Sequence, residues 1–361
     1  MIQSPNPLKW IADRDRRFPT MKLILQTLPA MLVFFCSMTL ADTISVCPDG
    51  TCDHQDIQAA VDAAGEGDEI QVAAGVYTSS HPSQVVDIKG KQLTLRSIAG
   101  PGRTIIDGEG QRRGIACIRG ETAQTLVSGF TIVNCRASPT DYNFNGAIDY
   151  WEDDGAGMII FGSSPTIASC EFKENIAQGD NAGGGLFMLF SDSLLEGCRF
   201  TANQAASWGA GVLIDISSPT FNECVFEDNI AGLGGGGLGV ANSDPALSGC
   251  IIRNNQGDLG TGLLIVETGT TSLFDCIICD NAPQPIHGSW HDGGGNEISE
   301  QCVPSCPADL DGDNVVDGTD LGVLLAFWGD SGLFPAADIN NDQRVDGQDL
   351  TMLLGLWGTC P

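Results

Sequence analysis

The chain is poor in basic and in aromatic residues. It holds 17 lysines and arginines against 46 aspartates and glutamates, which gives a formal net charge of −29, and only 7% of its 361 residues are aromatic. A chain this acidic repels nucleic acid and anionic membranes and attracts divalent cations. We therefore expect no nucleic-acid partner. The low aromatic content leaves Val, Ile, Leu and Cys to fill the core, which suits a glycine-rich repeat protein.

Long apolar runs are scarce as well. One lies near the N-terminus, where Met21 and Lys22 precede LILQTLPAMLVFFCSMTLA and the small residue Ala41 stands before Asp42. A basic start, an apolar stretch and a small residue are typical of a secretory signal peptide, so we predict one over residues 1–41, with Met21 as an alternative start. No second run of about 18 apolar residues follows. We therefore expect no membrane span after signal removal, and a secreted or cell-surface protein.

Five cysteines recur at a nearly constant interval, and an asparagine follows each of them five residues later. The intervals between the cysteines are 28, 26, 26 and 26 residues. The pairs are Cys170 with Asn175, Cys198 with Asn203, Cys224 with Asn229, Cys250 with Asn255, and Cys276 with Asn281. A fixed period of this kind predicts a solenoid in which each repeat is one coil stacked on the next.

Each period contains short apolar runs bounded by glycine, which favours strands over helices. In runs such as CEF at Cys170 and CRF at Cys198, the cysteine and the residue two positions later share one face. That face must be the interior, because the residues between them, Glu171 and Arg199, are charged. Three short strands in a coil of about 26 residues predict a mostly β fold, a right-handed parallel β-helix over residues 42–302. The alternatives are a β-sandwich or a propeller, whose blades need about 40 residues or more.

The asparagines and cysteines of the repeat are interpreted as packing residues. Stacked asparagine amides can bond along the solenoid axis at corners and tolerate left-handed backbone geometry. In-register cysteines on parallel strands point the same way, which strains a disulfide, so we expect packed thiols. Candidate disulfides for an oxidising compartment are Cys47–Cys52, Cys279–Cys302 and Cys306–Cys360.

The segment from His54 to about Gly120 has a different pattern. Ile57, Ala60, Val61 and Ala64 fall on one face of a short helix that can cover the open end of the stack. The series that follows, GDEIQVAAGVY, LTLRSIAGPGRTIIDG and GFTIVN, resembles the opening of secreted pectin-lyase-like β-helix proteins, and the resemblance extends over roughly residues 54–300. It implies the fold and leaves the activity open.

Two acidic loops near the C-terminus, DLDGDNVVDGTD and DINNDQRVDGQD, have the spacing of EF-hand-type calcium loops. Each offers oxygen side chains at positions 1, 3, 5, 9 and 12 and a free carbonyl at position 7, as Ca²⁺ requires. The predicted ligands are Asp309, Asp311, Asp313, Val315 (carbonyl), Asp317 and Asp320 in the first loop, and Asp338, Asn340, Asp342, Arg344 (carbonyl), Asp346 and Asp349 in the second. Self-repulsion in the empty loops predicts that Ca²⁺ binding and folding are one event.

The same apolar stripe follows each loop and predicts two helices that pack on each other. The stripes are Leu321, Leu324, Leu325 and Trp328, and Leu350, Leu353, Leu354 and Trp357. Loop then helix, twice, resembles a type I dockerin, which implies a small all-α calcium-binding domain over residues 303–361 and a cohesin-like partner. The chain departs from that pattern where Asn314 and Gln343 replace glycine at loop position 6. The alternative is a calcium-independent helical hairpin.

A third stretch fits the same calcium spacing. Its ligands would be Asp141, Asn143, Asn145, Ala147 (carbonyl), Asp149 and Glu152. Glycine at position 6 and glutamate at position 12 favour Ca²⁺. No clear helix follows it, and a plain Asp/Asn-rich turn explains it equally well.

Catalytic residues do not stand out in the sequence. The acids most able to approach one another across coils are Asp215, Asp244, Glu267 and Asp275, while His287 with His291 suggests a metal pair or a polar end-cap. Trp208 and Trp290 suit sugar stacking or core packing. The sequence therefore favours a secreted scaffold or adhesion protein that binds glycan or protein and docks through its calcium module. The alternative is an extracellular polysaccharide lyase or glycoside hydrolase, and a groove with two acids within about 10 Å would favour it.

Overall fold

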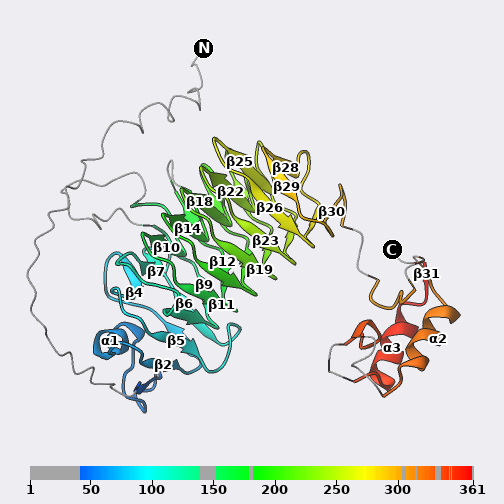
Figure 1. The fold of residues 1–361 in the computed structure, drawn as a ribbon. Helices are drawn as coiled ribbons and strands as arrows, with labels where there is room; N and C mark the ends of the chain where they lie inside the picture. The colour runs from blue at the N-terminus through cyan, green and yellow to red at the C-terminus, as the bar shows by residue number, and fades with distance from the viewer. Residues whose placement is uncertain are drawn as a thin grey trace, which may run out of the picture. The chain divides into compact units, whose positions relative to one another are not determined.

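The computed structural model describes residues 41–137, 152–178 and 182–302, and residues 306–359 except 312, 314, 330–334, 341 and 343. All but the last residue of the predicted signal peptide therefore lie outside the described residues. The described residues between 42 and 302 form a parallel β-helix, and a small helical module follows in sequence (Figure 1). None of the described helices is long and apolar enough to cross a membrane.

Three long parallel sheets, here called A, B and C, make up the β-helix (Figure 1). Sheet A has ten strands: β1 (Thr43–Val46), β2 (Glu69–Val72), β5 (Thr94–Ser97), β8 (Leu126–Ser128), β11 (Thr166–Ala168), β15 (Leu194–Glu196), β19 (Thr220–Asn222), β23 (Ala246–Ser248), β26 (Thr271–Phe274) and β29 (Trp290–Asp292). Sheet B has nine: β3 (Gly75–Tyr77), β6 (Thr104–Asp107), β9 (Thr131–Val133), β12 (Glu171–Lys173), β16 (Arg199–Thr201), β20 (Val225–Glu227), β24 (Ile251–Arg253), β27 (Ile277–Cys279) and β30 (Glu297–Ile298).

Sheet C and two small sheets complete the list of strands. Sheet C has eight strands: β4 (Gln84–Asp87), β7 (Arg113–Cys117), β10 (Met158–Phe161), β14 (Leu186–Leu189), β18 (Val212–Asp215), β22 (Leu238–Ala241), β25 (Leu263–Val266) and β28 (Ile286–His287). A three-stranded sheet D joins β13 (Ile176–Ala177), β17 (Gln204–Ala205) and β21 (Ile230–Ala231). In the C-terminal module β31 (Val315–Val316) pairs antiparallel with β32 (Gly358–Thr359).

The cysteine ladder faces the interior, as the alternation of side chains predicts. Cys198 and Cys224 are fully buried, and the phenylalanines two positions later stack in register. Ring centroids lie 4.9 Å apart for Phe172 and Phe200 and 5.1 Å apart for Phe200 and Phe226. These distances are close to the spacing of paired strands, about 4.8 Å, so equivalent side chains of successive coils touch their own copies.

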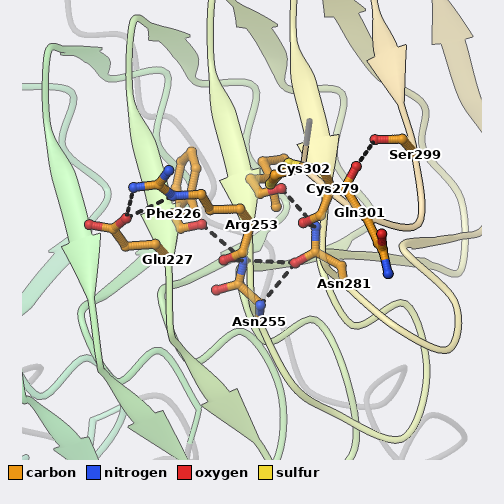
Figure 2. Close-up of a disulfide and its surroundings, with 10 residues drawn as sticks. Phe226, Glu227, Arg253, Asn255, Cys279, Asn281, Ser299, Gln301 and Cys302 are labelled. Atoms are coloured by element: carbon orange, nitrogen blue, oxygen red, sulfur yellow. Dashed lines mark hydrogen bonds and ion pairs between the residues drawn. A yellow bond between two sulfur atoms is a disulfide. The ribbon is translucent and has the colours of Figure 1, made fainter. Parts of the chain in front are cut away.

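The asparagine ladder is confirmed as a chain of buried amides. The Asn203 side chain donates to Asn229 Oδ1 at 3.0 Å and to the Phe172 carbonyl at 2.8 Å, and the same bonds recur in the following coils. Figure 2 shows the last step, from Asn255 to Asn281. The left-handed residue of each corner is the one before the asparagine, such as Asp228 at φ 58°. Left-handed geometry was expected at the asparagine itself, and the structure places it one residue earlier.

Sheet C is buried on both faces, which the sequence did not reveal. Its inward residues join the main core, and its outward residues Ile159, Phe187 and Leu189 form a second apolar cluster, against which Trp208 packs. The strands of sheet C are near-continuous apolar runs, which is typical of parallel sheets covered on both faces. Sheets A and B keep their outer faces available to solvent along most strands.

A helix, α1 (Ile57–Ala63), caps the N-terminal end of the stack, as predicted. Ile57, Ala60 and Val61 are buried, and α1 contacts β1, β2 and β4. Its last carbonyls accept hydrogen bonds from Lys91 Nζ, which lies 2.6 Å from the Val61 and Ala64 oxygens. This amine satisfies backbone groups that a helix end leaves open.

The C-terminal module contains α2 (Gly318–Ala326), a short 3₁₀ helix (Pro335–Ala337) and α3 (Gly347–Gly355). It also holds the β31–β32 pair, so it is not purely helical. Leu324 and Leu353 are buried, but Trp328 and Trp357 are 46% and 49% exposed, and Leu325 and Leu354 are exposed as well. The expectation that both full stripes pack on each other was wrong. The helices are short, and loop residues such as Val316, Ala337 and Val345 fill the shared core.

The cysteines divide into disulfides and protected thiols. Cys47–Cys52 and Cys279–Cys302 are disulfides, as predicted (Figure 2 shows the second). Cys306 is disulfide-bonded, and its predicted partner Cys360 lies outside the described residues. The free cysteines of the described chain are all buried: Cys117, Cys135, Cys170, Cys198, Cys224, Cys250 and Cys276.

The buried thiols will be unreactive in the folded protein. Burial raises the pKa of Cys117 and Cys135 above the ordinary value, and the thiolate is the reactive form. A thiol-specific chromogenic reagent will therefore label none of the seven at neutral pH and all of them in denaturant. Fast labelling of two or more without denaturant would contradict the closed core.

Candidate functional site

The corner between sheets A and B forms a groove along the outside of the β-helix. From β8 to β26, each sheet A strand is followed directly by one left-handed residue, which turns the chain toward sheet B. The strand ends are hydrogen-bonded in register from Ala168 through Glu196 and Asn222 to Ser248. The corner therefore repeats once per coil and runs parallel to the solenoid axis.

The groove has a volume of about 690 Å³ and a polar lining. Its lining consists of Ala168, Ser169, Glu196, Gly197, Asn222, Glu223, Ser248, Gly249 and Asp275. Three of these residues are carboxylates, and all three are exposed. Within the described part of the chain, none of these carboxylates enters a side-chain hydrogen bond or ion pair. Their hydrogen-bonding capacity is thus available to a ligand.

Glycines open the groove on both sides of Glu223. Gly197, Glu223 and Gly249 occupy the same left-handed corner position in successive coils, with φ values of 57°, 52° and 61°. A Cβ at Gly197 would meet only the Ser169 hydroxyl at 3.9 Å, and one at Gly249 would meet the Glu223 side chain at 3.6 Å. The missing side chains therefore leave free space beside an acid. Glycine accepts this backbone geometry readily, whereas glutamate is unusual there.

No lysine or arginine lines the groove. The nearest bases along the chain, Arg199 and Arg253 on sheet B, both bind Glu227, at 2.5 Å and 2.6 Å (Figure 2 shows the Arg253 contact). Burial, the largest single influence, opposes ionisation of Glu227, but hydrogen bonds from Arg253 and Arg199 together lower its pKa below the ordinary value. This ion-pair ladder engages the sheet B cations, and the acidic charge of the groove is left uncompensated by its own lining.

The four acids expected to approach one another do not converge. Only Asp275 lies in the groove. Asp215 is buried on the outer side of sheet C, Asp244 accepts a hydrogen bond from the Thr270 amide at 2.8 Å, and Glu267 binds the Asn242 side chain. Glu196 and Glu223, which the sequence analysis did not single out, take their place. Glu196 stands two residues before Cys198, and Glu223 stands one residue before Cys224.

The two candidate histidines lie on different sheets, and the two candidate tryptophans pack against apolar clusters. His287 belongs to β28 of sheet C and His291 to β29 of sheet A, so the predicted metal pair falls on two different sheets. Trp290 packs against the main core, and Trp208 packs against the outer cluster of sheet C. Neither tryptophan lines the groove.

The first predicted calcium loop brings three of its carboxylates together. Ligand oxygens of Asp309, Asp311 and Asp320 lie within 4.8 Å of one another. Asp320 accepts from the amides of Leu310, Asp311 and Asp317, and a carboxylate has about four lone-pair sites, so it can still take a cation. Loss of hydration, together with the carboxylates of Asp313, Asp320 and Asp309, raises the pKa of Asp311. This donor set fits a hard divalent cation such as Ca²⁺.

The second loop repeats the same backbone pattern. The Asp342 amide donates to Asp338 Oδ1 at 3.0 Å, and Asp349 accepts from the amides of Asn340 and Asp346. Asp317 and Asp346 cap α2 and α3, with Asp320 and Asp349 completing the capping boxes. These acids therefore shape the loops and begin the helices. The carbonyl positions Val315 and Arg344 lie inside the same two loops.

The third predicted loop falls almost wholly outside the described residues. Of its predicted ligands only Glu152 is described, and it is fully buried. Its carbonyl accepts from Arg113 Nη2 at 2.9 Å, and the same buried guanidinium binds the carbonyls of Asp154 and Gly155. Arg113 thus fixes the chain where it enters β10.

The fold and its grooved corner define a parallel β-helix protein. Residues 113–303 match the family described as the right-handed beta helix region, which is more than half of the chain, so the chain belongs to this family. No curated protein matches it.

Several solved structures are similar to the chain at low identity. Pectin methylesterase from carrot is 14% identical over 74% of this chain and 86% of that chain, with a TM-score of 0.38. Pectin methylesterase PemA from Erwinia chrysanthemi is 11% identical over 69% and 80%, with a TM-score of 0.40. An alginate lyase from Paenibacillus sp. is 12% identical over 71% and 99%, with a TM-score of 0.28. Likeness at these TM-scores carries no inference about activity or substrate.

Proposed function

We propose that this protein hydrolyses an extracellular polysaccharide in the groove between sheets A and B. The observation that carries the proposal is the presence of three carboxylates in one open groove. Glycoside hydrolysis needs two acids on either side of the bond, one to protonate the leaving oxygen and one to act as nucleophile or to activate water. The groove favours this enzymatic alternative over a scaffold that only adheres.

The spacing of the acids supports a hydrolase. Glu223 and Asp275 lie at the same corner position two coils apart, about 9.6 Å at the spacing of paired strands. Glu196 stands one coil before Glu223 and one residue earlier, about 6 Å away between backbone positions. Both separations fall within about 10 Å, the range of glycosidase carboxylate pairs. A lyase would instead use a basic side chain, and the groove lining contains none.

Neutralising the central acid will abolish most of the activity. We expect Glu223→Gln to lower kcat on a cleaved polysaccharide by about 100-fold or more, because positioned acid–base groups contribute about 10²–10⁴. The rate at which reducing ends are released from a panel of neutral and acidic polysaccharides measures this loss of activity. The matched control is Glu174→Gln, an exposed glutamate with φ 54° at a different corner. Equal activity of both variants, or no cleavage of any polysaccharide, would refute the assignment.

The C-terminal module supports a second role, calcium-dependent docking. We propose that its two loops bind Ca²⁺ and that its helices dock on a cohesin-like protein. The support is the cluster of Asp309, Asp311 and Asp320 and the exposure of the apolar side chains Trp328 and Trp357, since exposed apolar groups can mark interaction sites. Two disulfides in the β-helix are compatible with secretion, because disulfides persist in oxidising compartments.

A further inference from the structure

The groove ends in an exposed aromatic ring. Phe274 pairs in register with Ser248, so it occupies the next step of the ladder that begins at Ala168 and includes Glu196. Its side chain is 38% exposed. A Cβ at Gly293 in the following coil would sit 2.1 Å from the ring, so the ring lies over a glycine. An exposed, flat apolar face in line with a polar groove is a platform on which a sugar ring can stack.

The residues at the corner of the groove repeat once per coil of the β-helix. At the left-handed corner position, Gly197 and Gly249 alternate with Glu223 and Asp275, and Glu196 adds a carboxylate one residue before Gly197. Successive coils are about 4.8 Å apart, which is close to the rise per residue of an extended pyranose chain. A chain laid along the axis would therefore place one sugar per coil. A chain with two-fold screw symmetry would present the same face at every second coil.

The charge of the groove selects against acidic chains. Its lining holds three carboxylates and no basic residue, and the protein as a whole carries a net charge of −29. A polyuronate laid along the groove would meet like charge at three of its five coils, whereas hydroxyl groups can donate hydrogen bonds to ionised carboxylates. Ser169, Asn222 and Ser248 add uncharged partners.

From these observations we infer that the groove binds a neutral β-linked polysaccharide, parallel to the solenoid axis, with one sugar per coil and a terminal sugar stacked on Phe274. The inference rests on the proposed function for the location of the site. It adds the substrate class, the direction of the chain and the number of subsites. Five coils, from Ser169 to Asp275, contribute to the groove.

Binding to size-defined oligosaccharides tests this inference without requiring cleavage. Calorimetry on the full chain with cello-oligosaccharides and xylo-oligosaccharides should show affinity rising with length and levelling off at about five sugars, one for each coil. Oligogalacturonates should bind at least about tenfold more weakly, with or without added Ca²⁺. Preferred binding of oligogalacturonates, or a requirement for Ca²⁺ to bridge them, would overturn the inference.

Two substitutions locate the chain in the groove. Phe274→Ala should weaken binding about tenfold, the upper range for an aromatic stacking contact. Gly249→Asn should block the groove, because asparagine tolerates left-handed backbone and adds a side chain beside Glu223. The control is Gly162→Asn, since Gly162 has φ 55° and open space around it, and Asn242 has the same geometry at an equivalent corner. Unchanged affinity in both groove variants would place the sugar elsewhere.

The results for binding and cleavage separate the two proposals. Neutral oligosaccharides that bind in the groove but are not cut would leave this inference standing and remove the hydrolase assignment. Cleavage of a polyuronate that depends on Glu223, without binding of neutral chains, would support the hydrolase assignment and remove this inference.

Discussion

Removing calcium will unfold the C-terminal module and leave the β-helix intact. Asp309, Asp311 and Asp320 oxygens lie within 4.8 Å of one another. Because the ion-free loop concentrates negative charge, we expect metal binding and folding of the module to be linked. A ligand present at a thousandfold over its Kd stabilises by about 4 kcal/mol per site. Loss of the ion therefore removes a contribution comparable with the stability of a small domain.

Far-UV circular dichroism of the full chain with chelator measures this effect. Helices α2 and α3 have nine residues each and α1 has seven, so most of the helical signal should disappear while the β signal remains. Asp311→Ala should weaken Ca²⁺ binding at the first loop, and Asp258→Ala, an exposed aspartate of the β-helix, should not. Unchanged helicity in chelator together with no heat of Ca²⁺ binding would refute the calcium proposal.

Interrupting the asparagine ladder will destabilise the β-helix by about 4 kcal/mol or more. Asn229 Oδ1 accepts from the backbone and side-chain nitrogens of Asn203, and its Nδ2 donates to Phe200 and Asn255. Asn229→Ala removes these four buried hydrogen bonds. Asn203 Nδ2 keeps the Phe172 carbonyl and Asn255 Oδ1 keeps the Asn229 amide, but the Asn203 amide and the Phe200 carbonyl lose this partner, and each buried group left unpaired costs about 1–3 kcal/mol. The bonds run along the axis, so the loss affects coils on both sides.

Chemical denaturation followed by tryptophan fluorescence and circular dichroism measures this loss. The control is Gln256→Ala, which removes an exposed amide next to Asn255 and should change stability by less than about 0.5 kcal/mol. An equal denaturation midpoint for Asn229→Ala and Gln256→Ala would show that the ladder contributes little to stability.

The repeat was predictable because its coils share one constraint. Cys224 and Phe226 alternate with Glu223, Val225 and Glu227, which are exposed or half-buried, and this period of two determines which side of the strand faces the core. The capping helix at Ile57 and the disulfides Cys47–Cys52 and Cys279–Cys302 followed from equally local patterns. The buried outer face of sheet C was not predictable, because residues from other coils cover Phe187 and Leu189.

The groove could not be predicted from a motif. Glu196, Glu223 and Asp275 lie in different repeats and at two different positions of the repeat, and their proximity depends on the register of paired strands. The sequence instead drew attention to Asp215 and Glu267, which the fold places in other surroundings. The exposure of Trp328 and Trp357 was missed for a related reason, since helix periodicity does not show that loop residues fill the core of the module.

By itself, the sequence determined the stacked coil, its interior ladders and the capped N-terminal end, because each depends on a periodic choice between buried and exposed residues. It also determined the spacing of the two acidic loops. The tertiary structure alone decided which acids share a groove, that its lining carries no base, and that Phe274 lies at its end. Those relations join residues one or more coils apart in sequence, and only the strand register brings them within reach of one ligand.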